Sequence, residues 1–384
     1  MMKLRACLAL LAFFCTPAIA QHHAPRGELA ISAAADREGR LWVVFAKAGQ
    51  LWLAHTAGGA ESISAPIMVT DTPDKITAHG ENRPKIAISK QGVMLITWTV
   101  ASTKAYAGHV MFTRSTDGGK HFEKPRRINE DDRDISHRFD NLIIDGAGRV
   151  HVVWVDRRDV EDAKARLEER AGASIYHAYS DDDGATWSPN QRLAESSCEC
   201  CRIALSLDAK GEVQALWRHV FPGGIRDHAM LSPGAKGTPL RATFSDWQIN
   251  ACPHQGPTLA IDANNNRHLA WFAGGADAGL YYSRLDANGM PLGAALRLTE
   301  HGANPAIVVK GAKVAVLWTR FDGSAHQLEL AHSHDAGSTW HAPTPIAASA
   351  GAVDYPQWVM QQDRLHALWR TADEGIRLID RVQP

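Results

Sequence analysis

The chain has 384 residues and a formal net charge of −1, with 41 basic and 42 acidic side chains. This balance excludes the broad basic surface that nucleic-acid binding requires. Beyond its first residues the sequence contains no apolar run of about 18 residues or more, so we expect no membrane span.

The first twenty residues have the form of a secretion signal. Lys3 and Arg5 precede an apolar run, Cys7 to Cys15, that is too short to cross a bilayer. A small-x-small sequence follows and ends at Ala20. We therefore expect cleavage after Ala20 and an exported protein, periplasmic or secreted. The mature chain, residues 21–384, is expected to form one domain, since no linker or low-complexity stretch divides it.

One local pattern recurs seven times: a turn residue, then alternating apolar residues that end on an aromatic. The terminal aromatics are Phe45, Trp98, Trp154, Trp217, Trp271, Trp318 and Trp369. Alternation with period two predicts half-buried strands, and a repeat of about 50 residues with four short strands is a propeller blade. We expect an all-β propeller of seven four-stranded blades, or six if one repeat is irregular. The last repeat stops soon after its aromatic, so the N-terminal segment is expected to complete that blade.

Three segments carry a second motif. They are STDGGKHF (115–122), SDDDGATW (180–187) and SHDAGSTW (333–340). They resemble the Asp box, S-x-D-x-G-x-T-W, of the sialidase-like propeller superfamily, and the resemblance covers essentially the whole mature chain. The aspartate accepts hydrogen bonds from its own turn, and the glycine permits the tight path. The resemblance implies structural boxes between the third and fourth strands of their blades, away from the active face.

The resemblance also implies what a sialidase site would contain: three arginines that hold the substrate carboxylate, a Tyr–Glu nucleophile and an aspartate acid–base. The matching positions in this sequence are Arg83, Arg138, Arg202, Tyr355 and Asp140, with Glu81 in one of the same loops. The F/Y-R-I-P motif that normally supplies the first arginine lacks its Phe and Ile here. Pairing of these arginines with nearby acids around the channel is the alternative interpretation.

Four cysteines remain beyond the predicted signal, and they gather in two loops. In the fourth repeat, Cys198 and Cys200 lie 19 and 17 residues before the terminal aromatic. In the fifth repeat, Cys252 and His254 lie at the same two distances. These loops lead into innermost strands, so the thiols and the imidazole are expected to meet beside the axis, with Cys201 as a spare or resolving thiol.

Three interpretations of this group stay open: structural disulfides, a metal site and thiol redox chemistry. Thiolates with imidazole suit Cu(I) or Zn(II), and soft sulfur ligands favour copper, so copper is expected first and zinc second. The expected ligands are Cys198, Cys200, Cys201, Cys252 and His254. Further candidate ligands are histidines of nearby loops and of the mature N-terminus: His137, His219, His228, His22 and His23.

The leading functional hypothesis from the sequence is an exported metal-binding propeller, with copper or another small ligand at the rim of the axis. A sialidase or related glycoside hydrolase is the alternative. A propeller face that binds another protein, with structural disulfides, is a third.

Overall fold

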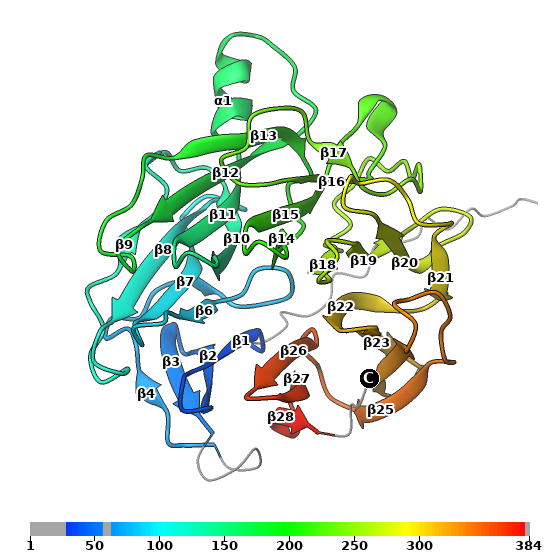
Figure 1. Cartoon of the computed structure of the whole chain (residues 1–384). Helices are drawn as coiled ribbons and strands as arrows, with labels where there is room; N and C mark the ends of the chain where they lie inside the picture. The colour runs from blue at the N-terminus through cyan, green and yellow to red at the C-terminus, as the bar shows by residue number, and fades with distance from the viewer. Residues whose placement is uncertain (1–27, 57–62, 381–384) are drawn as a thin grey trace, which may run out of the picture.

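The computed structural model describes residues 28–56 and 63–380. Its strands form seven separate sheets arranged around one axis (Figure 1). The predicted seven-bladed all-β propeller is confirmed, and the six-bladed alternative is wrong. The predicted signal, residues 1–20, lies outside the described residues, as do His22 and His23.

The first three blades follow one another along the chain. Blade 1 contains β1 (Ile31–Ala35), β2 (Leu41–Lys47), β3 (Gln50–His55) and β4 (Ile67–Met68). Blade 2 contains β5 (Ile76–Thr77), β6 (Lys85–Ile88), β7 (Met94–Ala101), β8 (Gly108–Ser115) and β9 (Arg126–Arg127). Blade 3 contains β10 (His137–Ile144), β11 (Val150–Asp156), β12 (Ala173–Ser180) and β13 (Gln191–Ser197).

The remaining four blades repeat this order. Blade 4 contains β14 (Ala204–Leu207), β15 (Val213–Arg218), β16 (His228–Leu231) and β17 (Leu240–Arg241). Blade 5 contains β18 (Thr258–Ile261), β19 (Arg267–Ala273), β20 (Gly279–Leu285) and β21 (Leu296–Thr299). Blade 6 contains β22 (Ala303–Lys310), β23 (Lys313–Phe321), β24 (His326–Ser333) and β25 (Thr344–Ser349). Blade 7 contains β26 (Gln357–Gln361), β27 (Arg364–Thr371) and β28 (Gly375–Ile379).

Helical structure is confined to two short segments of the described chain. The helix α1 (Arg158–Ala165) follows β11 and projects beyond the ring, and a 3₁₀ turn (Pro222–Gly224) follows β15 (Figure 1). Neither segment is long and apolar enough to cross a membrane, and no other helix occurs within residues 28–56 and 63–380.

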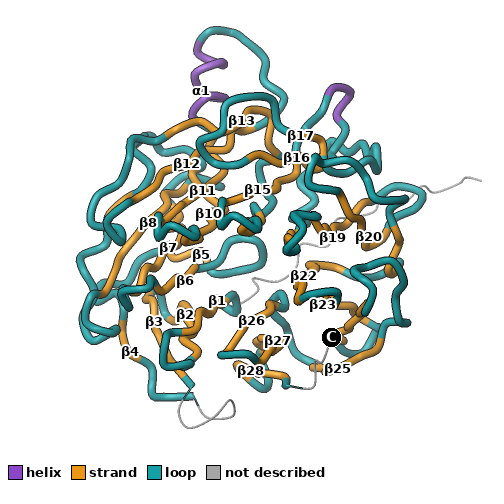
Figure 2. The backbone as a smooth tube through the Cα atoms, in the orientation of Figure 1, coloured by secondary structure: helices purple, strands orange, loops and turns teal. Residues whose placement is uncertain are grey.

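Within a blade, consecutive strands pair antiparallel, except that β5 and β6 of blade 2 both pair with β7, so the chain runs outward from the axis as a meander (Figure 2). The second strands are covered by neighbouring blades, which explains why β11 is buried at every position. Six tryptophans that end these strands are at most 2% exposed: Trp98, Trp154, Trp217, Trp271, Trp318 and Trp369. Trp154 packs with side chains of both blade 2 and blade 3, so the repeated aromatic fills the space between blades.

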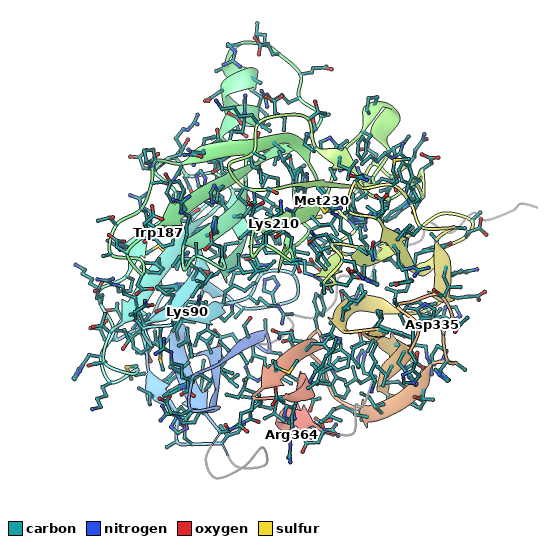
Figure 3. The ribbon with its side chains drawn as sticks, in the orientation of Figure 1. Lys90, Trp187, Lys210, Met230, Asp335 and Arg364 are labelled. Carbon is teal, nitrogen blue, oxygen red and sulfur yellow. The ribbon has the colours of Figure 1, made fainter. Side chains whose placement is uncertain are left out.

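The Asp boxes lie between the third and fourth strands, as predicted. In the second box, the Asp182 carboxylate accepts hydrogen bonds from the Thr186 backbone and hydroxyl at 2.8 and 2.7 Å. Gly184 has a φ of +77°, and an added Cβ would lie 2.5 Å from Phe112 of the preceding blade. Trp187 is half-buried rather than buried, since it packs edge-on against Phe112 in the outer part of the ring (Figure 3).

The ring closes by side-chain packing and polar contacts rather than through a shared strand. Buried apolar residues of blade 1 form one cluster with Val359 and Leu368 of blade 7. Asp354, just before β26, accepts hydrogen bonds from the Ile31 backbone N–H of blade 1 at 3.1 Å and from the Arg83 guanidinium of blade 2 at 2.9 and 3.1 Å. The expectation that the N-terminal segment completes the last blade concerns residues that lie mostly outside the described ones, and it stays a prediction. β1 is the innermost strand of blade 1, where it pairs with β2, and blade 7 has three described strands.

Replacing Asp354 by Ala should weaken the closure strongly. The Arg83 and Asp354 side chains are only 7% and 1% exposed, so the variant leaves a buried guanidinium without its carboxylate. We expect the free energy of unfolding, measured by urea denaturation, to fall by about 3–5 kcal/mol. Asp181→Ala is the matched control, because Asp181 pairs with Arg149 at the surface, and it should lose less than about 1 kcal/mol. Equal losses in the two variants would contradict this account of closure.

Candidate functional site

At one end of the axis, residues that lead into the innermost strands meet from different blades. The backbone N–H and guanidinium of Arg202, just before β14, donate to the two carboxylate oxygens of Glu81 at 2.6 and 3.1 Å. The same guanidinium donates to the carbonyl oxygens of Pro257 and Pro305 at 3.1 and 2.7 Å. One side chain of blade 4 therefore binds to blades 2, 5 and 6 across the axis.

Tyr355 lies beside two guanidinium groups at the same end. The Arg83 and Arg202 guanidinium carbons lie 5.4 and 6.0 Å from the centre of its ring. Tyr355 is 8% exposed, and a Cβ added to Gly80 would stand 3.0 Å from its hydroxyl oxygen. The structure thus brings together Arg83, Arg202 and Tyr355, which the sequence singled out, along with Glu81.

Arg138 contacts different groups. Its guanidinium donates to the Tyr106 carbonyl oxygen at 3.3 Å, lies 5.0 Å from the centre of the Phe139 ring, and interacts electrostatically with Cys200. Burial lowers the pKa of Arg138, and its Nε is buried without a hydrogen-bond partner among the described residues.

The three-arginine clamp implied by the family resemblance is therefore not assembled by these contacts. Arg83 and Arg202 each bind a carboxylate that is 1% exposed, which matches the alternative of arginines paired around the channel. The physical reason is charge: a guanidinium held deep in protein requires a counter-ion, and Asp354 and Glu81 supply it.

Lys85 and Asp140 interact electrostatically from the neighbouring innermost strands β6 and β10. The hydroxyls of Thr97 and Thr99 donate to the Asp140 carboxylate at 2.6 and 3.2 Å. Burial lowers the pKa of Lys85 to about 7 and raises the pKa of Asp140. Sequence reasoning named Asp140 but missed Lys85. Lys85 is the first residue of an innermost strand and lies two residues after Arg83, and this position could have indicated it as a site residue.

These residues form one group at the end of the axis, which we call the axial cluster: Glu81, Arg83, Lys85, Asp140, Arg202 and Tyr355. Lys85 and Arg202 remain partly exposed, so the group is open to a ligand at the end of the channel.

A second group, here called the thiol triangle, consists of Cys198, Cys200 and Cys201 between β13 and β14. Their Sγ atoms lie 3.8 Å (Cys198–Cys200), 4.0 Å (Cys200–Cys201) and 3.7 Å (Cys198–Cys201) apart, far beyond the roughly 2.05 Å of a disulfide. All three are free and at most 4% exposed. Hydrogen bonds from the other two thiols lower the pKa of Cys198, and the same contact with Cys198 raises the pKa of Cys200.

The second cysteine loop only partly joins this group. Cys252 is free and exposed, and a hydrogen bond with the Cys200 thiol lowers its pKa. The ligand atoms that lie within 4.8 Å of one another belong to the three cysteines of the thiol triangle, without Cys252 or His254. His254 is exposed with a φ of +50°, so equal spacing from the repeat aromatic did not give it the position of Cys200.

The other candidate histidines of the described chain are engaged elsewhere. The His137 Nδ1 lies 2.8 Å from the Asp156 carboxylate, and the His228 Nδ1 lies 3.1 Å from the Thr243 hydroxyl. His219 packs among aromatic rings, and burial lowers its pKa to about 4.

A histidine group lies on the outer part of blade 6, at positions where the sequence predicted packed surface residues rather than ligands. His332, His334 and His341 bring their ring nitrogens within 4.8 Å of one another around the third Asp box. Three histidines within ten residues of one box are the signal that would have found it.

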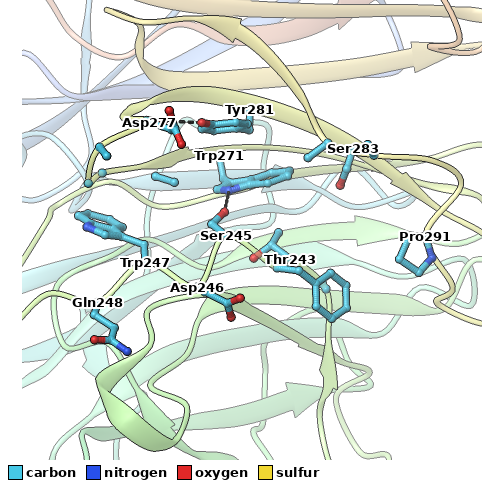
Figure 4. Close-up of a pocket in the computed structure, with 18 of the residues that line it drawn as sticks. Thr243, Ser245, Asp246, Trp247, Gln248, Trp271, Asp277, Tyr281, Ser283 and Pro291 are labelled. Carbon is cyan, nitrogen blue, oxygen red and sulfur yellow. Dashed lines mark hydrogen bonds between the residues drawn. The ribbon is translucent and has the colours of Figure 1, made fainter.

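A cavity of about 540 Å³ opens between blades 4 and 5 (Figure 4). Trp271 and Tyr281 stack in its wall with ring centroids 5.9 Å apart, and the Trp271 indole N–H donates to the Ser245 hydroxyl at 3.0 Å. Trp247 adds a third aromatic ring from the loop before β18. The polar groups of the lining include Asp246, Gln248 and Asp277. Aromatic walls with a few polar groups are typical of pockets for small ligands, and no motif in the sequence indicated this one.

Comparison with solved structures finds other propellers of low sequence identity. An ulvan lyase of polysaccharide lyase family PL25, bound to -[GlcA(1-4)Rha3S]-, is 13% identical, with 91% of this chain and 92% of the lyase covered and a TM-score of 0.58. The BP39L lectin from Burkholderia pseudomallei is 11% identical, with 91% and 98% covered and a TM-score of 0.59. A leech intramolecular trans-sialidase is 10% identical, with 89% and 82% covered and a TM-score of 0.51. These likenesses show a shared fold.

At the level of sequence, a search of curated proteins finds no match. Residues 50–367 match the family described as BNR repeat-like domain. This range covers most of the chain and all three Asp boxes, and the resemblance to sialidase-like propellers is confirmed. The chain belongs to the BNR repeat-like domain family.

Proposed function

We propose that this protein is a carbohydrate-active propeller that cleaves an acidic glycan at the axial cluster. The observation that carries the proposal is a lysine with a pKa near 7 at the same end of the axis as a tyrosine flanked by two guanidinium groups. A neutral lysine can serve as a general base at neutral pH, and a tyrosine hydroxyl can serve as a general acid. Cleavage of a glycosidic bond uses one base and one acid.

The axial cluster suggests a role for each side chain. Neutral Lys85 takes a proton from water or from a sugar carbon, and Tyr355 gives a proton to the leaving oxygen. Arg83 and Arg202 stabilise the phenolate that results. Arg202 keeps 19% of its side chain exposed and is placed to meet a carboxylate or sulfate of the substrate.

The sequence alone placed copper binding first and glycan cleavage second, and we now place glycan cleavage first. The similar propellers include a polysaccharide lyase, a lectin and a trans-sialidase, and these descriptions support a carbohydrate ligand here. The proposal does not require a sialoside, because Arg83 and Arg202 already bind protein carboxylates. Export through the predicted N-terminal signal is part of the proposal and would bring the site to polymeric glycans outside the cytoplasm.

Tyr355→Phe should abolish turnover while leaving the fold intact, since only the hydroxyl is removed. The measurement is release of reducing ends or unsaturated products from uronic-acid, sulfated and sialylated glycans. We expect a decrease of at least about 100-fold in kcat, the scale of one general acid. Tyr179→Phe on β12 is the matched control and should keep full activity. No turnover by the wild type on any glycan of this panel would refute the proposal.

Lys85→Arg should also remove activity, because arginine stays protonated and cannot act as a base. In the wild type, Lys85 is protonated below pH 7, so kcat/KM should fall as pH drops through about 7 and reach a plateau above it. Lys90→Arg, at an exposed position on the same blade, should keep this profile. A wild-type profile that stays flat between pH 5.5 and 8.5 would rule out Lys85 as the base (roughly 1.5 pH units on either side of its pKa).

A second candidate function is glycan binding without cleavage, in the cavity between blades 4 and 5. The specific observation is its four aromatic side chains, Phe244, Trp247, Trp271 and Tyr281, which lie beside acidic and amide groups. Rigid aromatic faces supply much contact area at low conformational cost. This function does not use the axial cluster.

Trp247→Ala should then weaken glycan binding, measured by calorimetry or on a glycan array, by roughly 10-fold or more. Phe321→Ala is the control, because Phe321 is an aromatic 56% exposed on blade 6, away from this cavity. Binding that survives Trp247→Ala but is lost with Tyr355→Phe would assign the glycan to the axial cluster instead.

A further inference from the structure

The thiol triangle has no role in glycan cleavage, and its geometry is unusual for thiols that merely fill a core. The three Sγ–Sγ distances, 3.7, 3.8 and 4.0 Å, make a nearly equilateral triangle. The centre of such a triangle lies about 2.2 Å from each sulfur, close to the roughly 2.3 Å bond between a thiolate and zinc. All three sulfurs can therefore reach one metal ion without a movement of the chain.

Two arginines beside the triangle, the buried Arg218 and the half-buried Arg138, have no carboxylate partner among the described residues. The guanidinium of Arg218, 1% exposed, donates only to backbone carbonyls in the described structure, those of Arg226, Gln255 and Phe272, at 2.6 to 3.3 Å. It interacts electrostatically with Cys198, as Arg138 does with Cys200. No ion pair of either arginine occurs within residues 28–56 and 63–380. Buried charges in proteins require compensation, so these two arginines call for an anionic partner.

We propose that Cys198, Cys200 and Cys201 bind one thiophilic metal ion, Cu(I), as three thiolates. Three soft sulfur ligands in a plane suit Cu(I), whereas Zn(II) prefers four ligands. A Cu(I) ion with three thiolates carries a net charge of −2, which Arg138 and Arg218 together balance. Each thiol releases its proton to solvent as it binds, and the oxidation state of the metal does not change.

Cys252 provides the access path in this proposal. The triangle is almost fully buried, whereas Cys252 is exposed and its thiol interacts with that of Cys200. Thiolates exchange metal ions by adding one ligand before another leaves. A metal ion that first binds Cys252 is thus handed to Cys200 and then to the rest of the triangle.

The test is an anaerobic Cu(I) titration of the full chain in competition with a chromogenic Cu(I) chelator, with X-ray absorption of the loaded protein. The wild type should bind one equivalent with three sulfur neighbours at about 2.2–2.3 Å. Cys200→Ser with Cys201→Ser should weaken binding at least 100-fold. His332→Ala with His334→Ala is the control, because it removes the surface histidine group and should leave the affinity unchanged.

A separate variant is needed because the substitutions of buried cysteines could themselves prevent folding. Cys252→Ser alters an exposed thiol, so the fold should persist; the affinity should stay within a few-fold of wild type, while transfer of copper from the chelator slows at least 10-fold. Equal copper affinity in wild type and the double cysteine variant would overturn the site. Binding of Zn(II) that requires Cys252, without tight Cu(I) binding, would overturn the copper assignment. Neither result depends on glycan turnover, so failure here is distinct from failure of the proposed function.

Discussion

The guanidinium of Arg202 is the contact on which the axis of this propeller depends. Arg202 belongs to blade 4, and it donates hydrogen bonds to Glu81 of blade 2 and to backbone carbonyls of blades 5 and 6. Arg83 performs the matching task at the closure, where Asp354 of blade 7 receives hydrogen bonds from it and from blade 1. A propeller packs each blade mainly against its two neighbours, so contacts across the axis and at the closure make separate sheets into one ring. Buried ion pairs suit this purpose because they are directional and fail when one partner is removed.

The same contacts decide what chemistry the axis can perform. Arg83 and Arg202 each hold a protein carboxylate and Arg138 contacts other groups, so the three arginines do not assemble one sialidase-like clamp, even though two of them lie beside Tyr355. The axis then contains Tyr355, which lies beside two guanidinium groups, and Lys85. Burial lowers the pKa of Lys85, and the nearby Arg83 and Arg202 lower it further. Acid–base chemistry fits these groups better than recognition by an arginine triad does.

Two chemistries meet within a few residues of chain. Arg202 follows Cys201 directly, so the loop that contributes Arg202 to the axial cluster also contains the thiol triangle. Arg138 is not part of the axial cluster and interacts electrostatically with Cys200 instead. One loop between blades 3 and 4 thereby connects a polar axial site with a buried sulfur site, and a metal ion in the triangle would rigidify the backbone that carries Arg202.

The sequence by itself determined the architecture: the seven-fold repeat of alternating strands and aromatics, and the Asp boxes in their turns, are local patterns that each blade can satisfy alone. It also identified the cysteine loops and five of the six axial residues, because they lie where innermost strands begin. Only the tertiary structure decided which side chains meet. Arg83 pairs with Asp354 and Arg202 with Glu81 across different blades, and Trp247 reaches Trp271 through an irregular loop. Spacing along the chain specifies a strand and its face but not the direction of a loop. It therefore placed His254 beside the thiols in error, gave no sign of Lys85 or the cavity, and did not show that three histidines of the third Asp box meet.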